Sequence, residues 1–146
     1  MKNPEQTAIK QAELAIKYAK GFNVELKFSE QDISKIESIL DYYHQDLNPV
    51  FFKKIIRKFK NEEPTEAQIW SMATIWGSYI GELIRKFCNN DYKWVIEEAL
   101  NYEPMLHLKK DDNNRIFPVD KSYKRLKNGK EDSIQSFYDI IKMGII

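Results

Sequence analysis

The residues whose types and spacing could do chemistry gather in one stretch, WGSYIGELIRKF at 76–87. Two glycines four residues apart, Gly77 and Gly81, are followed at once by an acid and a base, Glu82 and Arg85. A carboxylate can act as a general acid or base, but it usually works with a second acid or a histidine. The stretch contains neither, so Glu82 by itself is a poor candidate for a catalytic residue.

The rest of the chain lacks the spacings of the common catalytic and metal sites. His44 and His107 are its only histidines and Cys88 is its only cysteine, which excludes the His-Glu-x-x-His and Cys-x-x-Cys patterns of zinc sites. The sequence also has no Gly-rich phosphate loop and no Gly-x-Ser-x-Gly elbow. We therefore predict a protein that is not an enzyme and that has no catalytic residues, cofactor or metal. A hydrolase in which Glu82 meets His44 or His107 is the least favoured alternative.

Local signals place the glycine-bearing stretch in a long helix. Thr65 and Gln68 form a capping box at its start, and the run Asn-Asn-Asp at 89–91 ends it after Phe87. On a helical wheel the apolar residues of 70–88 fill an arc somewhat wider than a half-circle. A narrow polar strip completes the circle, so the sequence predicts a helix that is buried on most sides.

The two glycines lie at the border between the apolar arc and this polar strip. Glycine inside a helix costs about 0.5–1 kcal/mol relative to alanine, so a pair needs a local reason. The spacing Gly77-x-x-x-Gly81 favours the close approach of another backbone. The alternative is a shallow floor for a ligand or partner, lined by Ser78, Glu82 and Arg85. We expect structural roles for the two glycines and for a neighbouring aromatic residue: Gly77, Tyr79 and Gly81.

Downstream of this helix the pattern changes to short strands. The segments 92–97, 104–110 and 115–119 are β-branched or aromatic and are separated by turn-like stretches, which indicates an antiparallel meander of about three strands. Exposed aromatic residues on such a sheet are typical anchors of a protein interface, although core packing is the favoured interpretation of these residues. We also expect Glu82 to be partly buried and to bind Arg85 or a backbone amide of the meander. The residues predicted to bind a partner are Ser78, Glu82, Arg85, Tyr92, Trp94 and Tyr102.

Helical patterns also occupy the segments on either side of these elements. Helices are predicted at 5–20, 30–45 and 50–60 and from Ser133 to the end of the chain, and an extended segment at 22–28. The predicted inner faces of the first and last helices are Ile9, Ala12, Ile16 and Ala19, and Ile134, Phe137, Ile140 and Ile141. The fold class is therefore α+β: a mainly helical N-terminal two-thirds, a small meander and a C-terminal helix.

Length and composition agree with one ordinary domain. The 146 residues are 42% hydrophobic and 31% charged, and we predict a single domain over 1–146 with its core in 22–146. The helix within 1–21 is expected either on the domain surface or as a semi-detached arm. The single cysteine, the absence of a secretory signal and the lack of a membrane-spanning window favour a cytoplasmic protein without membrane contact.

Charge gives a second possible function. The net charge is only +1, which argues against a dedicated nucleic-acid binder. Two basic stretches, 53–60 and 121–130, could still bind an acidic surface, and a small nucleic-acid-associated or regulatory protein is therefore the alternative function. The other interpretation is that each stretch is one solvated face, offset by nearby acids such as Glu62, Glu97 and Glu103.

The chain resembles a family of small, uncharacterised bacterial proteins. The resemblance rests on the box WGSYIGELIR, on Trp94 after it, and on IFPVDKSYKRLKNGKEDSIQSFY at 116–138, and it covers roughly residues 24 to 140. The family pattern is a helix with a Gly-x-Tyr-x-Gly-Glu-x-Ile-Arg core that precedes a Trp-bearing strand. Its members resemble the immunity proteins encoded beside secreted bacterial toxins. The resemblance thus implies a non-catalytic module whose partner is a cognate toxin.

Overall fold

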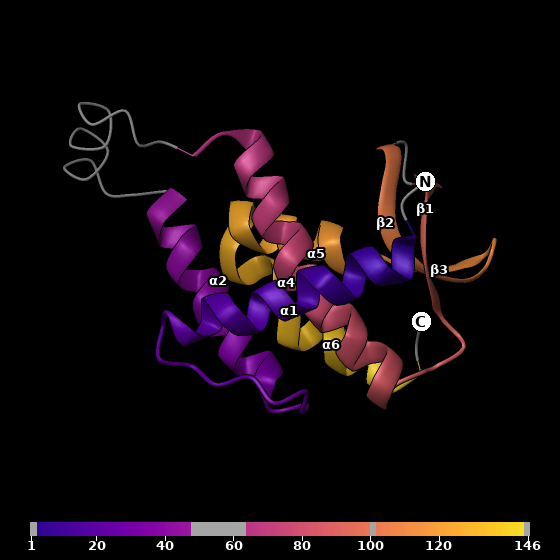
Figure 1. Ribbon diagram of the computed structural model, residues 1–146, viewed down its shortest axis with the longest axis horizontal. Coiled ribbons are helices and arrows are strands. Elements are labelled where there is room, and N and C mark those ends of the chain that lie inside the picture. Colours follow the sequence, from indigo (N-terminus) through magenta and orange to yellow (C-terminus); the bar gives the residue numbers. More distant parts are fainter. Residues whose placement is uncertain (1–2, 48–63, 100–101, 145–146) are drawn as a thin grey trace.

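The computed structural model describes residues 3–47, 64–99 and 102–144 (Figure 1). Its elements are, in chain order, α1 (Pro4–Lys20), α2 (Asp32–Leu47), α4 (Glu66–Phe87), β1 (Lys93–Ala99), β2 (Tyr102–Asp111), β3 (Asn114–Ile116), α5 (Pro118–Asn128), the 3-10 turn η1 (Gly129–Asp132) and α6 (Ile134–Lys142). This is the predicted α+β arrangement of helices, an antiparallel sheet and a last helix. The helix predicted at 50–60 lies outside the described residues. Within these ranges no helix is both long enough and apolar enough to cross a membrane.

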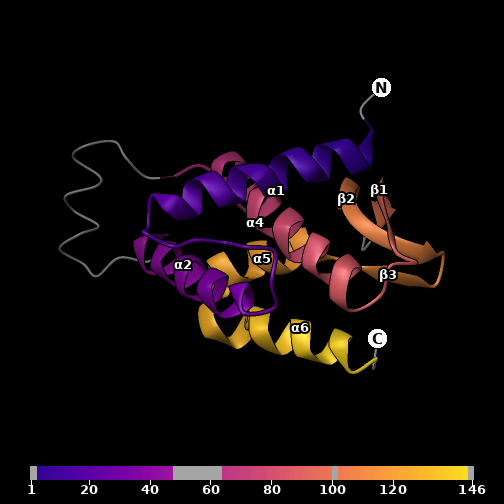
Figure 2. The same cartoon turned by 60° about the horizontal axis from the view of Figure 1, so that its bottom comes forward.

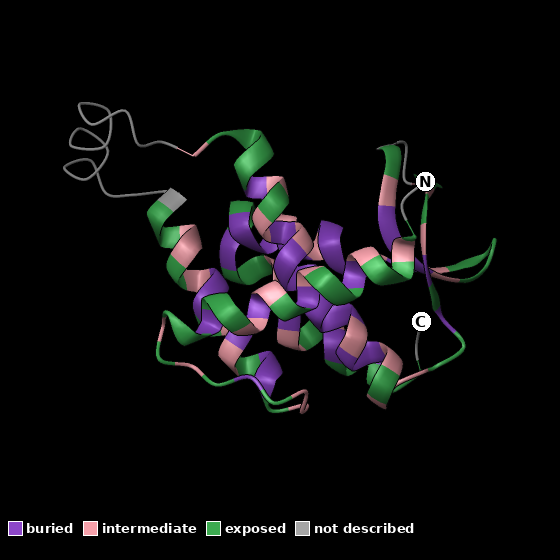
Figure 3. Ribbon diagram, viewed as in Figure 1, coloured by how far each residue is buried: buried purple, intermediate pink, exposed green. Residues whose placement is uncertain are grey.

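Helix α4 is the central element of the fold. The capping box that starts it is confirmed: Thr65 Oγ1 accepts a hydrogen bond from Gln68 N at 3.2 Å, and Gln68 Oε1 accepts one from Thr65 N at 2.8 Å. The helix ends at Phe87, as predicted. It is buried further around than the wheel indicated, because Ile75 and Ser78 in the polar strip are also buried (Figure 3).

Helix α1 packs mainly against α4, which is distant from it in the sequence (Figures 1 and 2). The face that α1 buries consists of Ala8, Ala12, Ala15 and Ala19. These small side chains let the two helices lie close together. The predicted inner face is wrong for Ile9, which is 39% exposed, because the four alanines and not the larger residues turn toward α4.

The sheet is the predicted meander, with the strands in the order β1-β2-β3 and both pairs antiparallel. Trp94, Leu108 and Ile116 lie opposite one another across the three strands and are buried, so they form the inner face. The third strand is shorter than predicted because Pro118 begins α5. Proline suits the first turn of a helix, where its missing N–H has no intrahelical partner.

The segment at 22–28 alternates in burial as predicted but forms no strand. Leu26 is buried, whereas Glu25 and Lys27 on either side of it are exposed. Asn23 and Phe28 have φ angles of 59° and 53°. This left-handed conformation bends the chain at both ends of the segment, so it cannot continue as a regular strand.

Helix α6 closes the fold against α2 and α4. Ile134 and Ile141 are buried as predicted, but Ile140 is 37% exposed and Tyr138 is buried in its place. At 100° per residue, positions 134, 138 and 141 share one face, and Ile140 lies about 100° or more from each of them.

Candidate functional site

The predicted site begins with the two glycines of α4, which form a packing seam. A Cβ atom added at Gly77 would lie 2.5 Å from Val119 Cα and 2.8 Å from Pro118 O, so the first turn of α5 touches the α4 backbone. A Cβ atom at Gly81 would overlap the indole ring of Trp94. The close-approach interpretation is therefore confirmed at Gly77. The space that could have been a ligand floor is filled by α5 and by Trp94.

Glu82 joins three elements from the edge of this seam. Its Oε2 atom accepts hydrogen bonds from Trp94 Nε1 and from Arg85 Nη1, each at 2.9 Å. Arg85 also pairs with Glu5 of α1 at 3.3 Å, and the Glu82 side chain is 19% exposed. The predicted partial burial and the bond to Arg85 are confirmed. The contact with the meander is made by the Trp94 side chain and not by a backbone amide.

Three of the six residues predicted to bind a partner are buried inside the protein. Ser78, Tyr92 and Trp94 are 0%, 3% and 5% exposed, so the expectation that they offer a contact surface is wrong. Glu82 and Arg85 are partly buried, and the side chain of Tyr102 lies outside the described residues. The physical reason is the packing of α1 on α4, together with the folding of the sheet against α4. The core interpretation of the aromatic residues is the one that the structure supports.

Tyr79 fixes the loop between α1 and α2. Its hydroxyl donates to Asp32 Oδ2 at 2.5 Å and accepts a hydrogen bond from Phe28 N at 2.8 Å. Asp32 Oδ2 also accepts from Lys27 N and Ser29 N. Burial by itself would raise the pKa of Asp32, but these hydrogen bonds outweigh it and hold the pKa below its usual range. Burial and the bond to Asp32 raise the pKa of Tyr79. The pair therefore acts as a structural clamp.

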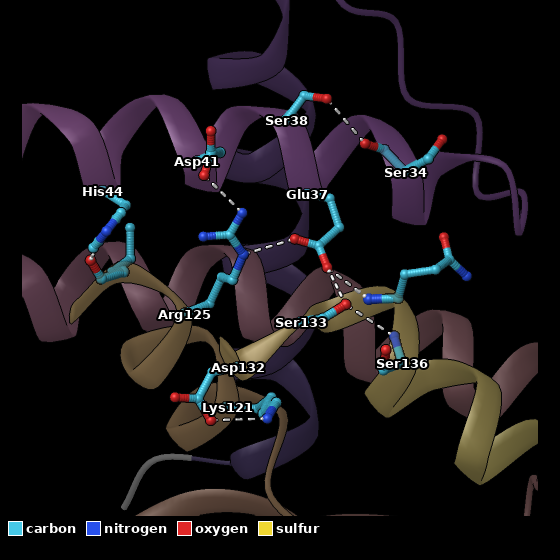
Figure 4. Close-up of polar contacts among 12 residues, drawn as sticks. Ser34, Glu37, Ser38, Asp41, His44, Lys121, Arg125, Asp132, Ser133 and Ser136 are labelled. Atoms are coloured by element: carbon cyan, nitrogen blue, oxygen red, sulfur yellow. Dashed lines mark hydrogen bonds and ion pairs between the residues drawn. The ribbon is translucent and has the colours of Figure 1, made fainter. Parts of the chain in front are cut away.

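A second polar cluster, which the sequence did not reveal, joins α2 to α5 (Figure 4). Arg125 is 2% exposed and donates from Nε to Glu37 Oε2 at 2.7 Å and from Nη2 to Asp41 Oδ1 at 3.0 Å. Glu37 Oε1 accepts further hydrogen bonds from Ser133 Oγ and Gln135 N, each at 2.8 Å, which brings α6 into the cluster. One signal was available, because Glu37 and Asp41 are spaced to share a face of α2.

The other basic residues of 121–130 are also largely paired with acids. Lys121 lies 3.1 Å from Asp132, Lys124 lies 3.1 Å from Asp120, and Lys127 lies 2.8 Å from Glu66. The stretch is therefore not an open basic patch. The second basic stretch, 53–60, lies outside the described residues. The nucleic-acid alternative stays a prediction that these pairs do not favour.

The remaining titratable candidates have separate partners. His44 Nδ1 lies 2.7 Å from Leu126 O, and His107 is bound to Met105 O and to Arg115. Glu82 is bound to neither histidine, so these contacts do not support the hydrolase alternative. Burial raises the pKa of the Cys88 thiol, as for a structural cysteine. Within the described ranges no group of His, Cys, Asp and Glu could hold a metal ion.

Exposed aromatic residues do occur, at the end of the molecule where α1 meets α2. Tyr18 and Tyr42 are 47% and 61% exposed. Phe22 makes edge contacts with Tyr42 and Tyr43, each with ring centroids 5.4 Å apart. Tyr18 and Tyr43 also line a pocket of about 460 Å³. Its other lining residues are Pro64, Ala67, Gln68, Ser71, Met72, Ile75 and Trp76. We call Tyr18, Tyr42, Tyr43 and this pocket the tyrosine surface.

Comparisons of the chain with protein-family models, with curated proteins and with solved structures found no match. The resemblance to the bacterial family, and through it to immunity proteins, therefore stays a prediction that rests on the residues quoted for it.

Proposed function

We propose that this protein is a non-catalytic binding module, an immunity protein that neutralises a cognate bacterial toxin in the cytoplasm. The observation that carries the proposal is the tyrosine surface. Tyr18 is exposed and lines an apolar pocket, and the exposed Tyr42 contacts Tyr43, which also lines it. Tyrosine is enriched among the residues that dominate binding at protein interfaces.

The composition of the tyrosine surface suits a protein partner. Met72, Ile75 and Trp76 supply an apolar floor, and Gln68 and Ser71 supply polar groups at the rim. An apolar centre with a polar rim is the usual anatomy of an interface. A tyrosine ring adds contact area at low entropic cost, and its hydroxyl can still bond to water or to the partner. We infer that the toxin places an aliphatic or aromatic side chain in the pocket.

The polar side chains of the box at 76–85 support a structural scaffold and not a reaction centre. Glu82 and Arg85 hold Trp94 and Glu5, and Tyr79 holds Asp32 and Phe28. These bonds fix α1, α4 and β1 relative to one another. A scaffold of this kind keeps the tyrosine surface in one shape, which reduces the entropy lost when a partner binds.

The proposal is tested with the product of the neighbouring gene. We expect that protein to be toxic when expressed alone, to co-purify with this chain, and to be harmless when the two are co-expressed. Tyr18→Ala and Tyr42→Ala should each raise the Kd of the complex by about tenfold or more, as substitutions of dominant interface residues do. Ile140→Ala, at an exposed apolar position on α6, is the matched control and should bind as the wild type does.

Two outcomes would overturn different parts of this proposal. No complex and no protection would reject the immunity function itself. Protection with full affinity in both tyrosine variants would keep the function and reject the tyrosine surface as its site.

A further inference from the structure

His107, in the middle of β2, is held in its neutral form by its two partners. The residue is fully buried, with Nδ1 2.9 Å from Met105 O and Nε2 2.8 Å from Arg115 Nη1. A carbonyl can only accept a hydrogen bond and a guanidinium can only donate one. Nδ1 therefore carries the proton, and Nε2 accepts from Arg115. The ring also stacks on Phe117, with centroids 4.8 Å apart.

The same nitrogen of Arg115 serves an acid. Arg115 Nη1 donates to Glu97 Oε1 at 3.0 Å as well as to His107. Glu97 in β1 and His107 in β2 lie on the same face of adjacent strands, because Val95 pairs with His107 and Glu97 with Met105. If Arg115 moves away from His107, the Glu97 carboxylate is therefore a nearby acceptor for the ring.

The charged groups around His107 come from all three strands and the turn that joins the last two. Arg115 of β3 and Lys109 of β2 oppose a positive charge on the ring, whereas Glu97 of β1 favours it. Asp112 pairs with both Lys109 and Arg115, at 3.1 and 3.6 Å. It can thus retain Arg115 after the bond to His107 is broken.

We propose that acid drives an exchange of partners on the outer face of the sheet. A hydronium ion gives its proton to His107 Nε2, Arg115 withdraws toward Asp112, and the new N–H donates to Glu97. Two cations cannot share the short contact that the neutral ring and the guanidinium make. The exchange loosens β3, because Arg115 is the middle residue of a three-residue strand that pairs only with the end of β2.

The pH at which the exchange occurs follows from the environment of the ring. Burial lowers the pKa of His107, the hydrogen bond to Met105 opposes this, and Arg115 lowers it further. The ring should therefore titrate below the value of about 6.5 that an exposed histidine has. The exchange of partners therefore does not occur at neutral pH, and it occurs when the pH falls.

The test is nitrogen NMR of the histidine rings together with amide hydrogen exchange of the intact protein. On going from about pH 7.5 to about pH 5 we expect His107 Nε2 to change from an acceptor to a protonated nitrogen. After correction for intrinsic rates, the β3 amides that bond to β2 should exchange about tenfold faster or more at the lower pH.

Two variants separate this exchange from general acid unfolding. His107→Gln retains an acceptor for Arg115 but cannot be protonated in this range, so its β3 amides should lose the pH response. His44→Gln is the matched control, because it removes the other histidine and should leave the response intact. A His107 ring that becomes protonated while the β3 amides stay protected would overturn the proposal. So would the same pH response in His107→Gln.

Discussion

A single missing side chain sets how closely α4 and α5 approach each other. The hydrogen atom of Gly77 faces the backbone of Val119 and Pro118, which cannot rotate away as a side chain could. Gly81 is different, because its neighbour is the side chain of Trp94. The two glycines share a spacing but have different partners, so only Gly77 fits the backbone-approach argument in full.

Gly77→Ala is therefore expected to destabilise the protein. Overpacking of this kind costs about 1–3 kcal/mol, which exceeds the gain of up to about 1 kcal/mol from replacing glycine in a helix. The free energy of unfolding in urea measures the balance. Ser71→Ala, at an exposed position of the same helix, is the control and should change little. A Gly77→Ala protein as stable as the wild type would mean that α5 can shift without cost.

At the scale of single residues, the sequence predicted the contacts that depend on local spacing. The Thr65–Gln68 capping box and the bond between Glu82 and Arg85 both join residues a few positions apart. The burial of Ser78 and Trp94 depends on α1 and on the sheet, whose docking is not encoded in the spacing of the α4 residues. The exposed Tyr18 and Tyr42 were missed for the same reason, since their neighbours come from different helices.

Helix α5 carries both a buried ion-pair residue, Arg125, and an exposed one, Lys127. Arg125→Ala leaves Glu37 and Asp41 without their cation at the contact with α2. Removing one partner from a buried pair costs about 3–5 kcal/mol, so we expect a large drop in the free energy of unfolding. Lys127→Ala removes a partner from an exposed pair on the same helix and should have little effect. Equal effects of the two substitutions in urea denaturation would contradict this account.

Helix α1 offers a test of its alanine face. Ala12→Leu inserts a larger side chain where the helix packs against the core and should cost about 1–3 kcal/mol. Ile9→Ala, on the exposed side, removes apolar atoms that are only partly buried and should cost less. Thermal unfolding followed by circular dichroism measures both. A stabilising Ala12→Leu would indicate that α1 is not packed against α4 as described.

Sequence patterns predicted some helices and strands better than others. The long helix and the meander were predictable because their periodicity is strong. Helix α5 was not recognised as a helix, because Pro118 and Val119 continued the β-like pattern of the preceding residues.

For the whole molecule, acid stability follows from carboxylates that tie distant elements together. Burial by itself would raise the pKa of Glu37, but hydrogen bonds from Gln135, Arg125 and Ser133 lower it below its usual value. The hydrogen bond from Arg125 lowers the pKa of Asp41, and Asp32 is lowered by the bonds described above. Carboxylates with depressed pKa values stabilise the fold above their unfolded pKa of about 4, and this contribution is lost as the pH falls through their folded pKa.

We therefore expect the free energy of unfolding to decrease steeply below about pH 4. Tyr79→Phe removes the donor to Asp32, which reduces the difference between the folded and unfolded pKa of that carboxyl. Its stability should fall less steeply with acid than that of the wild type, although it starts lower. Urea denaturation at several pH values measures both slopes. An identical slope in the two proteins would show that the hydrogen bond from Tyr79 to Asp32 does not contribute to the acid response.

The position of α4 also bears on the order in which the chain can fold as it is synthesised. Helix α1 is synthesised before α4, but the helix that covers its alanine face is completed only at Phe87. The space over the glycines of α4 is filled only after Trp94 and the start of α5 at Pro118 have also been synthesised. Contacts this distant in sequence form slowly, because the intervening chain must be closed first. The core of the nascent protein therefore stays incomplete until α6, with the buried Ile134 and Ile141, has been made, and until then the chain is most in need of protection from aggregation.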